Sequence, residues 1–172
     1  MKLFLKIALF TVVMPGTFAV LLPLVLVADR TAAGGATLGL ALCLLALGVV
    51  LYLRSARDFA VIGKGTPAPI DAPTRLVTRG FYRYTRNPMY VASLTLVAGW
   101  AALFGAAILV AYGVVLFVVF SLFVRLYEEP RLAREFGSEY TEYVQRVGRW
   151  LPRLLAGAAR GHHPKESTGE GP

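Results

Sequence analysis

Two short stretches of this 172-residue chain combine charged and aromatic side chains. The first, RGFYRYTRNPMY at residues 79–90, mixes arginines with tyrosines, and the second, RLYEE at residues 125–129, ends in two adjacent glutamates. An arginine can hold a carboxylate or a phosphate through two parallel hydrogen bonds, and an aromatic face attracts cations. Together these residue types predict a binding site for an anionic or zwitterionic ligand.

Each group also has an interpretation that involves no ligand. The arginines of residues 79–90 could hold a loop to lipid phosphates, and its tyrosines could belong to an interfacial aromatic belt. Glu128 and Glu129 could be favourable charges at the start of a helix, paired with Arg125 or Arg86. These interpretations do not explain why both stretches border the same apolar segment, so a ligand site is the stronger hypothesis.

The elements that must position these residues follow from three stretches without charge: 7–28, 31–53 and 87–124. About 20 apolar residues cross a bilayer core, so the first two predict one span each. The third is too long for one crossing and can turn at Phe104-Gly105. The sequence therefore predicts an all-α integral membrane protein with four transmembrane helices, at about residues 4–28, 35–53, 88–104 and 106–127.

The last two predicted spans form a tight antiparallel hairpin because the turn between them is short. Tyr90 and Glu128, which lie about equally far from the turn, are then brought close together. Every Lys and Arg except Arg30 falls on the other side of the membrane from the first and third connections. By the positive-inside rule, both termini and the site are cytoplasmic. The net charge of +8 suits anionic membrane lipids, so nucleic acid is not needed as a partner.

A cytoplasmic amphipathic helix is predicted after the fourth span, at about residues 130–147. Apolar residues recur there every three or four positions, and Pro130 suits a first helical turn. Residues 156–172 lack this periodicity, and we expect a disordered tail after one membrane domain of residues 1–155. The chain's two histidines, His162 and His163, lie in that tail, so we expect no functional metal site.

The order of the motifs resembles a known family. GKGTPAP, then RLVTRGFYRYTRNPMY, an apolar hairpin and LYEEPRLAREFGSEYTEYVQRVGRWLPR are similar to the bacterial branch of the isoprenylcysteine carboxyl methyltransferase family, which is related to the phospholipid N-methyltransferases. The resemblance covers roughly residues 50–153. It implies an enzyme of the bacterial cytoplasmic membrane that uses S-adenosylmethionine, with a cofactor pocket at the cytoplasmic ends of the last two membrane helices and the C-terminal segment.

The resemblance also implies roles for individual residues. Arg86 and Glu129 are implied as catalytic, and one of the two glutamates as the partner of the cofactor's ammonium group. Asn87 stands where the family more often has histidine, Phe81 where proline is frequent, and Ala92 where glycine often follows, so no general base is expected at position 87. The implied cofactor-binding residues are Tyr82, Arg86, Asn87, Pro88, Tyr90, Glu128, Glu129, Tyr140, Tyr143 and Arg149.

The chemistry agrees with these residue types. Methyl transfer from a sulfonium is an in-line displacement that needs alignment and exclusion of water more than acid or base groups. A carboxylate acceptor is already a nucleophile, whereas an amine or a thiol must lose a proton, and the expected site has no histidine. We therefore expect a lipidic or small apolar acceptor, methylated most favourably on a carboxylate, that reaches the site laterally between helices.

Three alternatives remain open at this point. A phospholipid headgroup amine could be the methyl acceptor. A nicotinamide-dependent membrane reductase shares part of the expected architecture, although such enzymes have longer chains. A non-catalytic membrane scaffold would use the arginines and aromatic residues as anchors, but it would not need paired glutamates beside Tyr90 and Asn87.

Overall fold

The computed structural model of the protein describes residues 2–63 and 74–153. These residues are almost entirely helical, and the one pairing of extended backbone among them joins Thr85 to Gly148. The predicted disordered tail and most of GKGTPAP lie outside the described residues. The elements are α1 (Lys2–Gly16), η1 (Thr17–Leu21), α2 (Leu22–Leu26), α3 (Gly35–Asp58), η2 (Phe59–Gly63), η3 (Gly80–Arg83), α4 (Pro88–Phe104), α5 (Ala107–Phe123), η4 (Val124–Glu128) and α6 (Glu129–Arg146).

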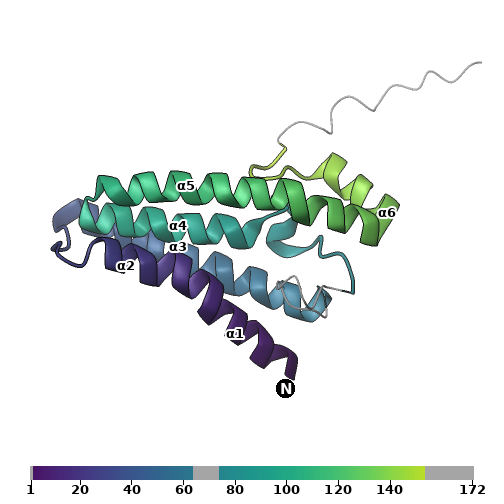
Figure 1. The fold of residues 1–172 in the computed structure, drawn as a ribbon, viewed down its shortest axis with the longest axis horizontal. Helices are drawn as coiled ribbons and strands as arrows, with labels where there is room; N and C mark the ends of the chain where they lie inside the picture. Colours follow the sequence, from purple (N-terminus) through teal and green to yellow (C-terminus); the bar gives the residue numbers. More distant parts are fainter. Residues whose placement is uncertain (1, 64–73, 154–172) are drawn as a thin grey trace, which may run out of the picture.

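The bundle has one long axis, along which α2, α3, α4 and α5 run side by side (Figure 1). Helix α1 continues from α2 through the π-helical η1 but diverges from the bundle. Among the described residues, three helical segments are long and apolar enough to cross a membrane: Leu5–Leu26, Gly35–Gly63 and the one that starts at Ala107. Helix α4 is apolar but has 17 residues, which is the lower limit for one crossing.

The helix predicted at residues 35–53 is longer than expected, because α3 runs to Asp58 and continues into η2. The end of the charge-free stretch marks the end of the apolar segment, and the helix itself continues past it. Arg54 and Arg57 are good helix formers with exposed side chains, so the helix continues beyond the apolar segment.

Helices α3 and α4 approach each other closely at two glycines. A Cβ atom at Gly48 would lie 2.7 Å from Leu96 Cγ, and one at Gly99 would lie 2.8 Å from Leu45 Cγ. Each glycine thus receives a leucine of the partner helix, which is how small residues bring membrane helices together. This contact fixes α4, which carries Asn87 and Tyr90 at its start.

Hydrogen bonds from side chains of α4 and α5 hold η1 against these two helices. Pro23 has no N–H for the carbonyl of Ala19 four residues earlier, and Trp100 Nε1 donates to that oxygen at 2.9 Å. The Tyr112 hydroxyl donates to the carbonyl of Phe18 at 2.6 Å. Neighbouring helices therefore satisfy backbone groups of η1 that a membrane would leave unpaired.

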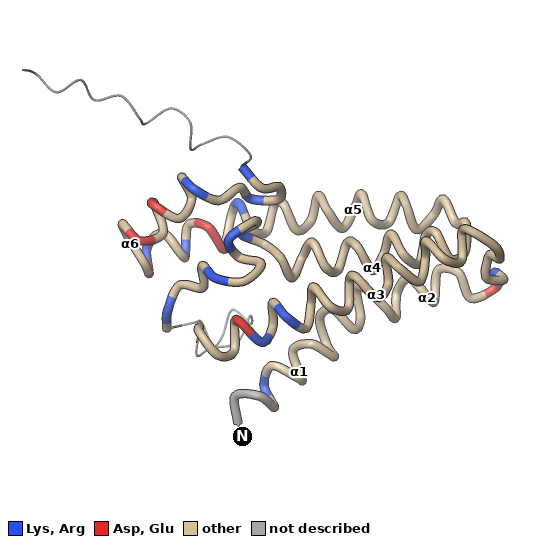
Figure 2. Tube along the Cα trace, turned by 180° about the vertical axis from the view of Figure 1, so that it is seen from behind, with Lys and Arg blue, Asp and Glu red and all other residues tan. Residues whose placement is uncertain are grey.

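The α4–α5 hairpin forms as predicted. Helix α4 ends at Phe104, Gly105 adopts the left-handed conformation with φ of 56°, and α5 begins at Ala107. A residue with φ in this region is favourable only as glycine, which makes a turn this short possible. Charged residues gather at the other end of the bundle, near α6 (Figure 2), whereas Asp29 and Arg30 follow α2 in the connection to α3. We call the end of the bundle near α6 the charged end.

The predicted amphipathic helix at residues 130–147 needs two corrections. It begins at Glu129 without a break from η4, so it continues the apolar helix and is not a separate element. It is also interrupted at Gly137, where φ is 52° and ψ is −121°, because glycine tolerates a conformation closed to other residues. Apolar periodicity alone could not reveal that change of direction.

Candidate active site

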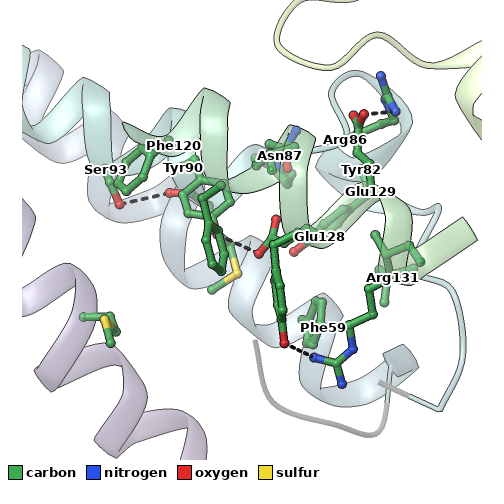
Figure 3. A pocket seen from close by; sticks show the side chains of 18 of the residues that line it. Phe59, Tyr82, Arg86, Asn87, Tyr90, Ser93, Phe120, Glu128, Glu129 and Arg131 are labelled. Atoms are coloured by element: carbon green, nitrogen blue, oxygen red, sulfur yellow. Dashed lines mark hydrogen bonds and ion pairs between the residues drawn. The ribbon is translucent and has the colours of Figure 1, made fainter. Parts of the chain in front are cut away.

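A cavity of about 490 Å³ opens at the charged end between η1, α4, α5 and α6. Its volume is in the range of sites that hold one drug-sized ligand. One end is polar, with Arg86, Asn87, Glu128, Glu129, Arg131 and Glu135, and apart from Ser93 the remainder is lined by apolar and aromatic side chains. Figure 3 shows the polar residues around this space. The cavity can therefore accept a molecule with a charged part and an apolar part.

Glu129 lies between two arginines. Its Oε1 is 2.8 Å from Arg86 Nη1, and Arg149 donates to both carboxylate oxygens at 2.7 Å. The side chain of Arg86 is 9% exposed and that of Glu129 is 18% exposed, so this cluster is shielded from solvent. The hydrogen bonds to Glu129 raise the pKa of Arg149 above its ordinary value. The charge of Glu129 is thus balanced by arginines of the protein itself. This agrees with the ligand-free interpretation of the sequence, in which a glutamate pairs with Arg86.

Arg86 has one donor that the fold does not use. Its Nη1 contacts Glu129 and lies 3.4 Å from the Tyr140 hydroxyl, but its Nε is buried and has no hydrogen-bond partner among the described residues. A buried charged donor without an acceptor is costly. Because Arg86 lines the cavity, this Nε–H is a candidate donor to an anionic group of a ligand.

The C-terminal segment 147–153 crosses the start of α4 and completes the site; we call it the strap. Backbone N–H of Arg86 donates to the carbonyl of Gly148 at 3.0 Å, beside the Thr85–Gly148 bridge. The carbonyl of Arg149 accepts from Thr85 Oγ1 at 2.9 Å and from Asn87 Nδ2 at 3.0 Å. The side chain of Asn87, expected to bind cofactor, therefore holds the strap in this structure.

Glu128 has surroundings different from those of Glu129. The Tyr90 hydroxyl donates to Glu128 Oε1 at 2.7 Å (Figure 3), which confirms the proximity predicted from the hairpin. The ring of Tyr90 packs against Phe120 at a centroid distance of 4.5 Å. Glu128 forms no ion pair with any residue that the structure describes, and it lines the cavity. Arg131 also lines the cavity and attracts Glu128 without forming an ion pair with it, so this carboxylate beside aromatic rings can still accept a cationic group.

Glu128 is placed by an irregularity in the helix. Residues Val124–Glu128 form a single π-helical turn between α5 and α6. Such a turn adds a residue to the helix and rotates the side chains that follow it, and it occurs frequently at functional sites. The adjacent glutamates point to different partners, Tyr90 and the two arginines, because successive residues of a helix project about 100° apart.

Two tyrosines close the polar end from the side of α6. The Tyr143 hydroxyl donates to the carbonyl of Tyr82 at 2.6 Å, and the rings of Tyr140 and Tyr143 lie 6.4 Å apart. Burial raises the pKa of the Tyr82 phenol well above its ordinary value, so this hydroxyl stays protonated. These residues form a neutral wall and do not add charge to the cavity.

The structure brings the predicted site residues together around one space. All of them line the cavity except Arg149, which reaches it through Glu129. Arg79 and Arg83, also in the first stretch, are exposed and do not line it. The residues that line the cavity are Tyr82, Arg86, Asn87, Pro88, Tyr90, Glu128, Glu129, Tyr140 and Tyr143.

Sequence reasoning missed two contributions to the site. Phe10, Met14 and Phe18 line the apolar part of the cavity from α1 and η1, and nothing in their spacing distinguishes them from residues that face lipid. Trp150 packs against Phe117 at 5.1 Å and against Tyr90 at 6.5 Å. The tryptophan in the polar stretch GRWLPR is a signal that could have identified the strap as a packed segment.

A charged pocket that continues into an apolar cavity, in a bundle of apolar helices, defines an integral membrane protein that can bind an amphipathic ligand. The family model for phospholipid methyltransferases matches residues 36–139, which is more than half of the chain, and the chain belongs to this family. No curated protein matches the chain with comparable significance.

Family membership makes the protein a membrane methyltransferase. Members of this family generally use S-adenosylmethionine, and the residues present fit that group. Glu128 offers a carboxylate without an ion-pair partner among the described residues, Arg86 offers a buried donor without a hydrogen-bond partner, and aromatic rings lie beside them. Within the described residues no group of His, Cys, Asp and Glu is arranged to hold a metal ion.

Proposed function

We propose that the protein transfers a methyl group from S-adenosylmethionine to a lipidic or small apolar acceptor, and that Glu128 holds the ammonium group of the cofactor. The observation that carries this assignment is the contrast between the two glutamates. Glu129 is ion-paired with two arginines, whereas Glu128 faces the cavity with a neutral hydrogen-bond partner, Tyr90, and is attracted by Arg131 only from beyond ion-pair distance. Glu128 is therefore the carboxylate that a cation would neutralise.

The remaining polar groups fit the other end of the cofactor's amino-acid part. The unused Nε–H of Arg86 would donate to its carboxylate, and Glu129 holds the guanidinium in place for that contact. The rings of Tyr90 and Phe120 would favour a sulfonium by cation–π attraction. Asn87 acts through the strap, because its side-chain amide is bound to the carbonyl of Arg149.

We propose a carboxylate as the favoured acceptor, which makes the product a methyl ester. The cofactor supplies an electrophilic methyl group; the acceptor oxygen forms a bond to that carbon while the carbon–sulfur bond breaks. The charges of carboxylate and sulfonium are neutralised in the step, and no proton has to be moved. This suits a cavity that, within the described residues, contains tyrosines and no histidine.

A phospholipid headgroup amine is the second candidate acceptor, and one observation favours it. Both arginines that line the cavity already have carboxylate neighbours, Arg86 at Glu129 and Arg131 at Glu135, so an acidic acceptor would have to share them. An amine needs no arginine, although it must lose a proton during methylation. This acceptor class is also the one named in the family's description. The resemblance of the motifs to the isoprenylcysteine carboxyl methyltransferases supports the first candidate instead.

The test uses protein solubilised in detergent and membrane lipids extracted from the source cells. S-adenosylmethionine should bind at equilibrium, whereas NADPH should not; the reverse result would indicate a reductase, and binding of neither would indicate a scaffold. With a tritiated methyl donor, mild alkali should release volatile label from a methyl ester. Label that stays in the headgroup after alkali would identify N-methylation and overturn the carboxylate assignment.

We further propose that residues 1–155 form one domain with four spans in the bacterial inner membrane, with both termini and the site in the cytoplasm. The segregation of charge supports this orientation (Figure 2). Cysteines at Thr31 and Gly169, in a Cys43→Ser background, should react with a membrane-impermeant reagent from opposite sides of right-side-out vesicles. Equal reaction of both from outside would contradict the four-span arrangement.

A further inference from the structure

The part of the cavity farthest from the charges forms an apolar arm between the N-terminal segment and α5. One wall consists of Phe10, Met14 and Phe18, and the other includes Val119 and Phe123. Four of these side chains, all but Phe10, retain between 38% and 52% of their exposure although they line the cavity. The arm is therefore open at the side, toward the region that the bilayer occupies around apolar helices.

The wall on the α1 side is held in place at two levels. At the turn-end level, Trp100 and Tyr112 donate to the carbonyls of Ala19 and Phe18. Nearer the charged end, the Tyr52 hydroxyl lies 2.9 Å from Thr11 Oγ1, which itself donates to the carbonyl of Ile7. The divergence of α1 in Figure 1 is thus a spacing fixed by hydrogen bonds to α3, α4 and α5.

The direction of the arm matches that of a lipid chain. From Glu128 at the charged end, the cavity and its arm extend along the same helix to Leu116, which is a distance of about 18 Å at 1.5 Å per residue. This is roughly half of a bilayer core of about 30 Å. A chain whose polar head lies at the charged end would run along this direction. The cavity has the volume of about one ligand, so a long chain would extend from the arm into the membrane.

We propose that this arm is the binding site for the apolar chain of the methyl acceptor, and that Phe10, Met14 and Phe18 determine which chains fit. The inference rests on the proposed function, since it places the acceptor's head beside the methyl donor. It goes beyond the family match because residues 36–139 do not include α1 or η1. The occupant is a saturated or isoprenoid chain attached to the acceptor, since the wall offers it no polar side chain.

The experiment uses the full-length protein in phosphatidylcholine nanodiscs. The probes are hexadecanoic acid and hexadecylamine that each carry a diazirine in the distal half of the chain, so that the chain is located whichever head binds. After photolysis, labelled residues are identified by peptide mass spectrometry. We expect saturable labelling of α1–η1 between Phe10 and Phe18 and of α5 at Val119–Phe123, competed by the unlabelled compound.

Exposed residues that do not line the cavity provide the comparison. Leu42 and Val115 are 55% and 60% exposed and measure labelling from bulk lipid. Labelling of the arm at the same yield as these two positions, without competition by either unlabelled compound, would overturn the proposal. Labelling confined to the second apolar groove, beside Trp150 and Leu151, would overturn it as well.

A matched pair of variants tests the role of the wall. Met14→Trp adds bulk inside the arm and should weaken labelling at least tenfold, while the dissociation constant of S-adenosylmethionine stays within twofold. Val12→Trp adds the same bulk on a side chain of α1 that is 69% exposed and does not line the cavity, and it should label like the parent. Equal labelling of both variants would remove the wall's role.

Failure of this inference is distinguishable from failure of the proposed function. If S-adenosylmethionine binds the parent but neither probe labels the arm, the acceptor chain lies elsewhere and the proposed function stands. If the arm is labelled but S-adenosylmethionine does not bind, the chain site stands and the methyl transfer is wrong.

Discussion

The same isosteric change should affect different properties at the two adjacent glutamates: cofactor binding in Glu128→Gln and stability in Glu129→Gln. In Glu128→Gln the amide oxygen can still accept the hydrogen bond from Tyr90, so the fold keeps its contact and loses a single charge. We expect the free energy of unfolding to change by less than about 0.5 kcal/mol. A charged contact to the cofactor's ammonium group, however, contributes about 1.5–3 kcal/mol, which corresponds to a loss of affinity of about 10- to 150-fold.

Glu129→Gln removes the counter-charge of two arginines. Arg149 is 30% exposed and can be solvated in part, but Arg86 is 9% exposed and would remain buried with its charge uncompensated. Removing one partner of a buried ion pair typically costs 3–5 kcal/mol, and partial exposure of Glu129 places the expected loss at about 3 kcal/mol. The first effect is therefore on stability, and cofactor binding fails as a consequence.

The assay measures both quantities on the same preparations. Unfolding is followed by tryptophan fluorescence during titration of mixed micelles with a denaturing detergent, and S-adenosylmethionine binding is measured by calorimetry at a temperature where each variant is folded. Glu128→Gln should match the parent in the first and fail in the second. If Glu128→Gln binds the cofactor like the parent while folded Glu129→Gln does not, the roles of the two glutamates have been exchanged in our reasoning.

Two further predictions use matched pairs. Arg86→Lys keeps the charge but loses the planar guanidinium that contacts Glu129 and carries Nε, so S-adenosylmethionine affinity or turnover should fall at least tenfold. Arg75→Lys, at an exposed position, should be neutral. Equal activity of the two variants at matched expression would mean that residues 79–90 only anchor the protein. Gly48→Ala places a Cβ against Leu96 and should destabilise the protein by about 1–3 kcal/mol in the same detergent titration. Gly39→Ala places a Cβ that meets no atom within 4 Å and should leave stability unchanged. Equal unfolding midpoints of the two variants would show that α3 and α4 separate at little cost.

The sequence predicted the helical hairpin and its consequence well. A charge-free stretch too long for one span, with Gly105 in its middle, has few ways to fold, and the Tyr90–Glu128 hydrogen bond follows from that turn. The match to residues 36–139 confirms the broader phospholipid methyltransferase family, while the isoprenylcysteine carboxyl methyltransferase branch stays a prediction. The roles of individual site residues remain predictions, although most of these residues line one cavity.

Other features depended on contacts that a sequence does not reveal. The adjacent glutamates have the same chemistry in the sequence, and which of them meets Tyr90 and which meets the arginines depends on the rotation that the π-helical turn gives the helix. The break at Gly137 could not be distinguished from a helical glycine by apolar periodicity. The role of Asn87 in holding the strap depends on a partner 62 residues away, the carbonyl of Arg149.

The strap also has a consequence for how the protein matures during synthesis. A ribosome makes the chain from its N-terminus, so the α4–α5 hairpin can insert before residues 147–153 have been made. Until then Thr85, Arg86 and Asn87 lack their strap partners, and Glu129 lacks Arg149. Docking of the strap is thus the step that organises the site. A nascent chain can therefore be in the membrane, with its helices paired, before its site is assembled.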